Sequence, residues 1–143
     1  MKKKKIIVPD FEEIDLETYL KKNASPCDLG FGDQSIEELI KIGNAVDSTK
    51  PLRIISDWYW FDVQCTQSEM KFYDKYGIKP AYLMAYQILH DTTQPQSIGN
   101  WVRTSPLLEF IKPGVFVTKN RIYIMAGNGS RMIVDDDFIS LIG

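Results

Sequence analysis

Four residues near the middle of the chain have the types needed for a metal-dependent catalytic site: Asp57, Asp62, Glu69 and Lys71. Nucleases that use a divalent cation hold it with carboxylates and place a lysine beside them. For Glu69 and Lys71 to act together, both side chains must lie on the same face of a strand. The Thr66-x-x-Glu69 pattern instead predicts a capping box, which places Glu69 in the first turn of a helix. A small metal-dependent nuclease or hydrolase is therefore an alternative, and structural roles are favoured for these residues.

A second candidate for catalysis is a thiol site that combines Cys65, His90 and an aspartate. Catalytic triads are assembled in space, so a wide separation in the sequence does not exclude this arrangement. His90 is the one histidine of the chain, which excludes a three-histidine zinc site and an H-E-x-x-H site. No recognisable nucleophile motif surrounds Cys65. We expect no catalytic residues, no metal ligands and no cofactor.

The charge balance favours a protein partner over nucleic acid. The chain has 17 Lys plus Arg against 19 Asp plus Glu, and its formal net charge of -2 provides no global positive field. An acidic and aromatic surface in the first half suits a basic partner, because complementary charge speeds encounter. The predicted partner contacts are Asp28, Asp33, Glu37, Glu38 and Tyr59.

Three arginines of the second half are candidates for binding nucleic acid: Arg103, Arg121 and Arg131. If they converge on one sheet face beside Trp101 and Tyr123, they form a cationic and aromatic patch suited to single-stranded nucleic acid or an acidic protein. Alternate residues of a strand point to opposite faces, so the pattern does not require this convergence. A solvated outer sheet face is the favoured interpretation, and a nucleic-acid-binding regulator is a further alternative.

The elements that must position these residues begin with two helices and a strand. The segment Asp10–Asn23 has acids early and lysines late, as the helix dipole prefers, and predicts a short helix. A Ser35-x-x-Glu38 capping box opens a second helix, and Gly43 is its predicted end. The segment Leu52–Gln64 is rich in β-branched and aromatic residues and predicts a central strand.

The segment from Thr66 onward predicts another helix and then strands. The capping box at Thr66 opens a helix that Gly77 and Pro80 stop. The segment Ala81–Leu89 is ambiguous between helix and strand by periodicity, and its short length favours a strand. Asp135–Asp137 opens a closing helical turn. Five strands are predicted in between, near Trp101–Thr104, Leu107–Ile111, Val115–Thr118, Arg121–Ala126 and Ser130–Val134.

Turn residues separate these strands. Tight reversals are predicted at Pro113-Gly114, Lys119-Asn120 and Gly127-Asn128-Gly129. With 143 residues and 44% hydrophobic content, the chain fits one domain with a real core. The predicted fold class is α+β. Its single domain spans residues 1–143, with N-terminal helices packed on a strongly bent antiparallel β-meander and a flexible basic segment at 1–9.

The location of the protein is predicted from its N-terminus and its cysteines. Lys2–Lys5 imitate the basic start of a signal peptide, but only three apolar residues follow before Pro9 and Asp10. No apolar run approaches the roughly 20 residues needed to span a bilayer. Cys27 and Cys65 suit a reducing compartment in which both are buried thiols, with a single disulfide as the alternative. A cytoplasmic protein that does not enter a membrane is expected.

The second half also carries a recognisable pattern. It consists of Trp101-Val102-Arg103-Thr104-Ser105-Pro106-Leu107, then Phe116, Thr118, Asn120, Tyr123 and Gly127-x-Gly129-x-Arg131. In these residues the chain resembles a family of small uncharacterised bacterial and prophage-borne proteins. The resemblance covers about the last third of the chain and implies no established catalytic residues. It implies a bacterial or phage setting, in which small acidic proteins often neutralise a toxin or a defence protein by binding it.

The resulting hypothesis is a non-catalytic cytosolic binding protein of the immunity or inhibitor type. It would occlude a protein partner, such as a basic toxin or a nuclease. The hydrolase and the nucleic-acid regulator are the alternatives. Edge strands of a short meander can also pair between copies, so a homodimer remains open.

Overall fold

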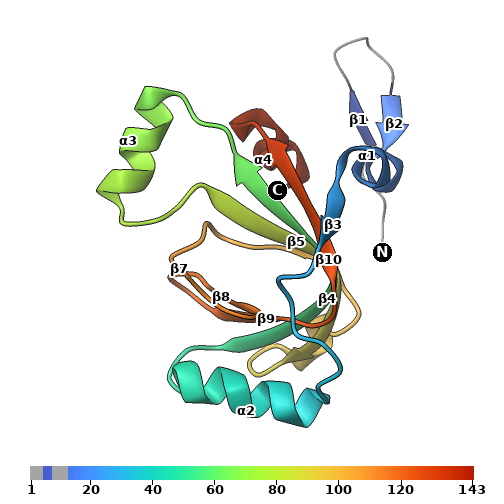
Figure 1. The fold of residues 1–143 in the computed structure, drawn as a ribbon, viewed down its shortest axis with the longest axis vertical. Coiled ribbons are helices and arrows are strands. Elements are labelled where there is room, and N and C mark those ends of the chain that lie inside the picture. Colours follow the sequence, from blue (N-terminus) through green and yellow to red (C-terminus); the bar gives the residue numbers. More distant parts are fainter. Residues whose placement is uncertain (1–4, 8–12) are drawn as a thin grey trace.

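The computed structural model describes residues 5–7 and 13–143, whose helices and strands are drawn in Figure 1. The helices are α1 (Leu16–Asn23), α2 (Ile36–Val46), α3 (Gln67–Lys75) and α4 (Asp136–Ile142), with a short 3-10 helix at Pro95–Ser97. The strands are β1 (Lys5–Ile7), β2 (Glu13–Asp15), β3 (Ser25–Cys27), β4 (Leu52–Val63), β5 (Ala81–Asp91), β6 (Val102–Arg103), β7 (Glu109–Ile111), β8 (Val115–Val117), β9 (Ile122–Met125) and β10 (Gly129–Val134). Helices around a strongly bent sheet confirm the predicted α+β class.

The long strands β4 and β5 form the centre of the sheet. They pair antiparallel from Arg53, opposite Asp91, to Asp62, opposite Ala81. Both predicted strands are confirmed, and β5 continues two residues past its predicted end at Leu89. The β-branched and aromatic residues that mark β4 are mostly buried, as a central strand requires.

The other edge of β4 pairs with both β9 and β10, and both run parallel to β4. Leu52 is opposite Ile122 and Tyr59 is opposite Ser130. The segment from Ile122 to Ser130 therefore has one residue more than the stretch of β4 beside it. The chain therefore continues in one direction through Gly127, and the predicted reversal there is wrong. The sheet is mixed, where the sequence predicts an antiparallel meander. The reversals between β7 and β8 and between β8 and β9 are confirmed.

The glycines that resemble a turn signal instead make room for Trp58, which is fully buried. The indole Nε1 of Trp58 donates a hydrogen bond to the carbonyl oxygen of Gly127 at 3.2 Å. A Cβ on Gly129 would overlap the ring and the carbonyl oxygen of Trp58, and a Cβ on Gly30 would overlap the Gly127 carbonyl. Gly127 also has a φ of 68°, which glycine adopts without strain. Close packing, rather than chain reversal, explains these residues.

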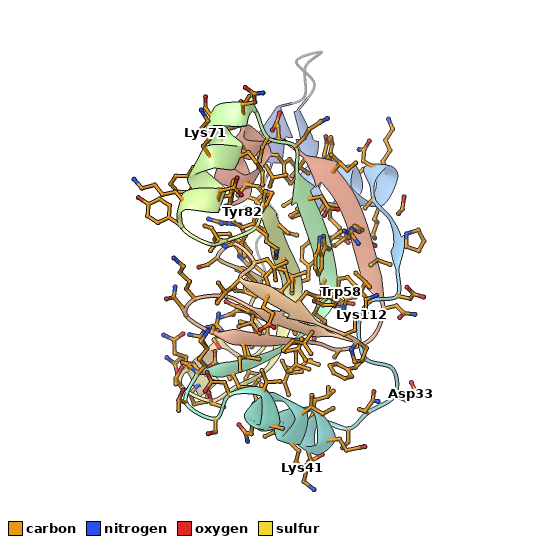
Figure 2. The ribbon with its side chains drawn as sticks, turned by 60° about the vertical axis from the view of Figure 1, so that its left-hand side comes forward. Asp33, Lys41, Trp58, Lys71, Tyr82 and Lys112 are labelled. Carbon is orange, nitrogen blue, oxygen red and sulfur yellow. The ribbon has the colours of Figure 1, made fainter. Side chains whose placement is uncertain are left out.

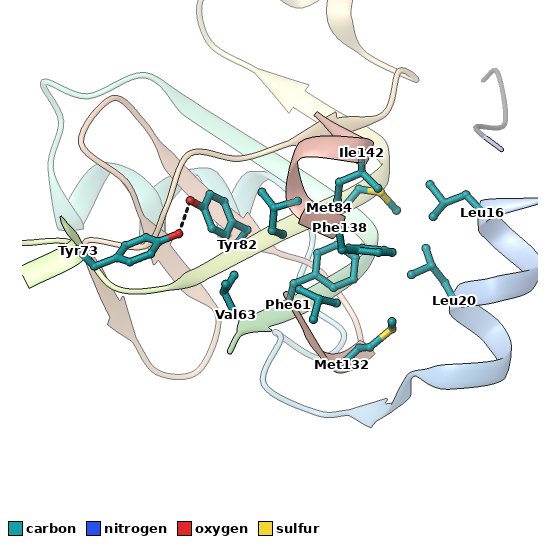
Figure 3. Packing of buried hydrophobic residues seen from close by; sticks show 12 residues of the cluster. Leu16, Leu20, Phe61, Val63, Tyr73, Tyr82, Met84, Met132, Phe138 and Ile142 are labelled. Carbon is teal, nitrogen blue, oxygen red and sulfur yellow. Dashed lines mark hydrogen bonds between the residues drawn. The ribbon is translucent and has the colours of Figure 1, made fainter. Parts of the chain in front are cut away.

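The helices cover the sheet at its two ends. Figure 1 shows α2 at one end, and α1, α3 and α4 at the other. The α2 end contains Leu39, which packs in a cluster with Leu52 of β4. At the other end, Leu20 of α1 and Phe138 of α4 join Phe61 of β4 in a second cluster (Figure 3). Burial of each such side chain contributes about 1.5–3 kcal/mol. No helix among the described residues is long and apolar enough to cross a membrane.

Most helix boundaries follow from the caps. The capping boxes at Ser35 and Thr66 and the closing helix after Asp135 are all confirmed. The first helix begins at Leu16, later than the predicted Asp10, because Glu13–Asp15 forms β2. Residues 8–12 lie outside the described residues, as do residues 1–4. The basic segment predicted to be flexible at 1–9 therefore lies largely outside them, and its residues 5–7 pair with β2.

The predicted end of α2 at Gly43 is wrong. The helix continues through Gly43 to Val46. Gly43 is buried, and a Cβ there would overlap the side chain of Leu52. The glycine therefore lets α2 lie close to β4 instead of ending the helix.

Helix α3 is attached to the sheet through Tyr73, its one buried residue. The Tyr73 hydroxyl lies 2.8 Å from the hydroxyl of Tyr82 (Figure 3) and 3.5 Å from a carboxylate oxygen of Asp136. Burial and the bond to Tyr82 raise the pKa of Tyr73, so the hydroxyl is neutral at pH 7. Phe72 and Tyr76 of the same helix are 55% and 46% exposed. One buried side chain thus anchors a helix that is otherwise largely solvated.

The substitution Tyr73→Phe is expected to lower the free energy of unfolding by about 1 kcal/mol, because the buried Tyr82 hydroxyl loses its partner. Hydrogen exchange should accelerate at the amides of α3 and stay unchanged in β4 and β5. Tyr76→Phe removes an exposed hydroxyl from the same helix and should change neither quantity. Equal effects of the two substitutions would contradict the role given to Tyr73.

Candidate functional site

The ladder of β4 is interrupted at Asp57. Among the described residues, Asp57 is the one non-glycine residue with a positive φ, 52°. The β4–β5 ladder has no paired residue there, and on the other edge pairing with β9 ends at Ile55 and pairing with β10 begins at Tyr59. An L residue in this conformation costs about 1–2 kcal/mol, and aspartate is one of the types that tolerate it. Backbone strain of this kind often accompanies a functional site.

A pocket of about 590 Å³ opens beside this interruption, and we call it the break pocket. Its volume lies within the usual range for small-ligand sites. The sheet supplies residues on β4 and β5, and α1 supplies two charged residues. The lining residues are Glu17, Lys21, Asp57, Trp58, Tyr59, Tyr86, Gln87, Gly99, Asn128, Gly129 and Ser130.

Two tyrosines form the aromatic part of the break pocket. Tyr59 and Tyr86 meet edge to face, with their ring centroids 6.0 Å apart and their planes at 78°. Both are half-buried. Burial raises the pKa of both hydroxyls, and the neighbouring carboxylate of Glu17 raises each further. Both rings are therefore neutral at pH 7 and present electron-rich faces.

The charged groups of the break pocket leave a negative balance. Glu17 forms an ion pair with Lys21 at 3.1 Å, with 69% of the Lys21 side chain exposed. A pair this exposed contributes at most about 1 kcal/mol and exchanges readily. Asp57 is exposed, and within the described part of the chain its carboxylate makes no hydrogen bond or ion pair. The pocket therefore combines two neutral aromatic rings with a carboxylate available to a cation.

Comparison with known proteins identifies a family. Residues 30–139 match the family described as Domain of unknown function (DUF6957). The chain belongs to the DUF6957 family. No curated protein and no solved structure matches it. The DUF6957 match contains the segment Trp101–Val134, on which the sequence resemblance depends, and every sheet residue of the break pocket. Glu17 and Lys21 on α1 precede it.

A second pocket, of about 790 Å³, lies along β3 and the neighbouring part of β10. In this edge pocket, Arg131 donates two hydrogen bonds to Asp62, from Nε at 2.7 Å and from the terminal nitrogen at 3.0 Å. The guanidinium lies 5.0 Å from the ring centroid of Trp60, whose Nε1 donates to Asp62 at 3.0 Å. Cation and carboxylate thus satisfy each other within the chain.

The five predicted partner contacts are not brought together. Tyr59 lines the break pocket and Asp28 lines the edge pocket. Asp33, Glu37 and Glu38 are exposed around the N-terminus of α2, and Figure 2 shows Asp33 on the loop that leads into this helix. The carboxylate of Glu38 accepts a hydrogen bond from the Ser35 backbone, which lowers its pKa and ties it to the cap.

The three predicted nucleic-acid contacts have separate partners. Arg121 pairs with Asp91 at 3.3 Å, and Arg131 pairs with Asp62. Arg103 lies over the ring of Tyr82, 5.6 Å from its centroid. Arg131 is opposite Trp60 of β4, whereas Arg121 precedes Ile122, which is opposite Leu52. Eight residues of a strand span about 26 Å, so Arg121 and Arg131 do not form one patch.

The carboxylates considered for metal catalysis are also separated. Asp57 and Asp62 are five residues apart on β4 and line different pockets. Glu69 accepts a hydrogen bond from the Thr66 backbone in the capping box. In the described ranges there is no group of three or more His, Cys, Asp or Glu side chains placed to hold a metal ion.

The thiol site is separated by the strand register. Asp62 lies opposite Ala81, whereas Ile54 lies opposite His90. Because Cys65 follows the Asp62 end of β4, Cys65 and His90 lie at opposite ends of the β4–β5 pair, separated by roughly 25 Å of strand, and cannot share one reacting centre. Cys27 and Cys65 are free thiols and half-buried, where the sequence predicts buried ones. Burial raises the pKa of Cys65, which makes it a poor nucleophile.

Several residues of the break pocket were not identified from the sequence, among them Glu17, Lys21 and Tyr86. The polar pair Ser56-Asp57 within an apolar strand is a local signal for an interruption of β4. No local signal connects α1 to that interruption, because their contact depends on how the helix packs on the sheet.

Proposed function

We propose that this chain is a non-catalytic binding protein of the immunity or inhibitor type, which occludes a basic protein partner. The observation that carries the proposal is the break pocket, where two half-buried tyrosines adjoin an exposed carboxylate. Tyrosine is enriched at protein interfaces, because it combines a large apolar ring with a polar group. The aromatic and acidic residues of the pocket therefore suit contact with a cationic side chain of another protein.

The charge of the chain supports the same kind of partner. Its formal net charge is -2, and acidic residues are exposed both at the break pocket and at the start of α2. Complementary charge steers a basic partner and speeds its association. The proposed partner is a basic toxin or nuclease in the cytoplasm of a bacterial or prophage-carrying cell.

Capture of a partner tests the proposal. The tagged protein is expected to retain one stoichiometric basic protein from a lysate of its organism of origin, and the purified partner should lose its own activity in a 1:1 mixture. Asp57→Asn is expected to weaken the complex about tenfold in calorimetric titration, because a charge-assisted contact is lost. Asparagine also tolerates a positive φ, so the backbone is preserved.

A matched substitution gives the control. Asp33→Asn removes an exposed carboxylate outside both pockets and is expected to leave the affinity unchanged. Weakening by Asp33→Asn alone would move the contact to the start of α2. A chain that captures no protein, or a partner that stays fully active in the complex, would contradict the proposed function.

A further inference from the structure

We infer that the break pocket binds a guanidinium group, supplied by an arginine side chain of the partner. This inference rests on the proposed function, which supplies the protein partner that carries the arginine. It adds the chemical group by which that partner is recognised. The ligand stacks on the two tyrosines while its nitrogens bond to the carboxylate of Asp57.

The aromatic part of the pocket suits a flat cation. A guanidinium is planar and weakly hydrated, and it stacks on aromatic faces more readily than a compact ammonium does. Tyr59 and Tyr86 are neutral, half-buried and fixed against each other edge to face. A ring held in place by its neighbour loses little side-chain freedom when a ligand stacks on it.

The chain itself shows how such a pair of residues receives a guanidinium. On one face of β4, Trp60 and Asp62 are two residues apart, and Arg131 stacks on the first while bonding twice to the second. Asp57 and Tyr59 of the same strand are also two residues apart and line the break pocket, with the acid and the aromatic residue in the opposite order along the chain. The break pocket therefore presents a second arrangement of an aromatic ring and a carboxylate.

No arginine in the described part of the chain, which contains every arginine of the sequence, occupies the second arrangement. The sequence has four arginines. Arg53 and Arg121 pair with Asp91, Arg131 pairs with Asp62, and Arg103 lies over Tyr82. The guanidinium that fits the break pocket must therefore come from another molecule.

The remaining groups of the pocket agree with this ligand. A guanidinium has five N–H donors and needs several acceptors. Gln87 and Asn128 offer amide oxygens, and Ser130 offers a hydroxyl oxygen, in addition to the carboxylates. Lys21 is the competing cation, because its ammonium pairs with Glu17 at the pocket wall. Removal of this ammonium should therefore favour the ligand.

A small-molecule titration of the whole chain tests the inference. The probe is Nα-acetyl-arginine amide, followed by chemical shifts of the backbone amides of Asp57, Tyr59 and Tyr86. The expected dissociation constant is on the order of 1 mM, which is usual for a ligand of this size. The citrulline analogue has the same shape without the charge, and it should bind at least about tenfold more weakly. The lysine analogue should also bind more weakly, because its ammonium is more strongly hydrated.

Two variants complete the test. Asp57→Asn should weaken binding of the arginine amide about tenfold. Lys21→Gln should strengthen it about threefold, a change that loss of structure would not produce. Equal binding of the citrulline or lysine analogue, or shifts confined to the edge pocket, would overturn the inference.

The inference and the proposed function fail in different ways. If the arginine amide binds as described but no protein partner exists, the proposed function is wrong and the guanidinium site stands. If a partner binds and its affinity is unchanged by Asp57→Asn and by excess arginine amide, the guanidinium site is wrong and the proposed function stands.

Discussion

Replacement of Gly129 by alanine is expected to lower the free energy of unfolding by about 3 kcal/mol, the upper part of the range for overpacked cores. The new Cβ would overlap two ring carbons and the carbonyl oxygen of Trp58. Trp58 is fully buried, and its ring is held by the hydrogen bond from Nε1 to the carbonyl oxygen of Gly127. Relief requires separation of β10 from β4, and the five paired positions between these strands resist it.

Gly32→Ala is the matched control for this prediction. Gly32 is exposed, and a Cβ there meets no atom within 4 Å. Its φ is not in the left-handed region, so alanine should stabilise slightly, by up to about 1 kcal/mol, through the unfolded chain. Urea denaturation followed by tryptophan fluorescence measures both variants. Equal stabilities of the two variants would show that Trp58 does not depend on the glycine.

The same packing connects the core to the break pocket. Trp58 and Gly129 both line the pocket and belong to the contact that fixes β10 beside β4. The extra residue between β9 and β10 lies where pairing with β4 stops, beside Asp57. The interruption of the ladder therefore lies beside the close contact between the indole of Trp58 and Gly129. Because the break pocket adjoins this contact, it should change shape in Gly129→Ala.

Local signals in the sequence predicted local structure well. The capping boxes at Ser35 and Thr66 each consist of four consecutive residues, and both open the expected helices. The β-branched and aromatic run of β4 likewise identifies its strand from its own composition. These features depend on neighbours in the chain, so they can be evaluated before any tertiary contact is known.

Structure that depends on distant contacts was not predictable. Gly43 has the residue type of a helix end, yet it lets the side chain of Leu52 on β4 lie against α2. Gly127 has the residue type of a turn, yet its carbonyl oxygen accepts a hydrogen bond from Trp58, 69 residues earlier in the chain. Tyr59 was predicted as a contact, but its pocket depends on α1 packing against β4. Residue type alone cannot distinguish a glycine that turns the chain from one that admits a neighbouring side chain.

The substitution Asp91→Ala is expected to lower the free energy of unfolding by about 3–5 kcal/mol, the usual cost of breaking a buried ion pair. The Asp91 side chain has no exposed surface and pairs with Arg53 and with Arg121, whose side chains are 10% and 17% exposed. It also accepts hydrogen bonds from the backbone of Thr93 and Gln94, which order the loop after β5. Alanine would leave two nearly buried cations unpaired.

Asp62→Ala is the matched control, because it removes the partner of Arg131 from an exposed ion pair. The side chain of Arg131 is 45% exposed and that of Asp62 is 35% exposed. The substitution should cost about 1–2 kcal/mol, because water solvates the freed guanidinium and only the Nε1 donor of Trp60 loses a partly buried acceptor. Urea denaturation at pH 7 measures both variants. Similar losses would mean that burial does not govern the strength of these pairs.

The stability conferred by Asp91 should also depend on pH. Burial alone would raise the pKa of this carboxyl, but the hydrogen bonds from Arg53 and from the Gln94 and Thr93 backbone outweigh it and hold the pKa well below its usual range. In the unfolded chain an aspartate takes up its proton near pH 3.9, whereas the folded carboxylate stays ionised, so acid favours the unfolded state. The difference in unfolding free energy between wild type and Asp91→Ala should be full above about pH 5 and shrink between about pH 4 and pH 2. Denaturation curves across that range check this, and a difference that stays constant would show that Asp91 stabilises the fold without its charge.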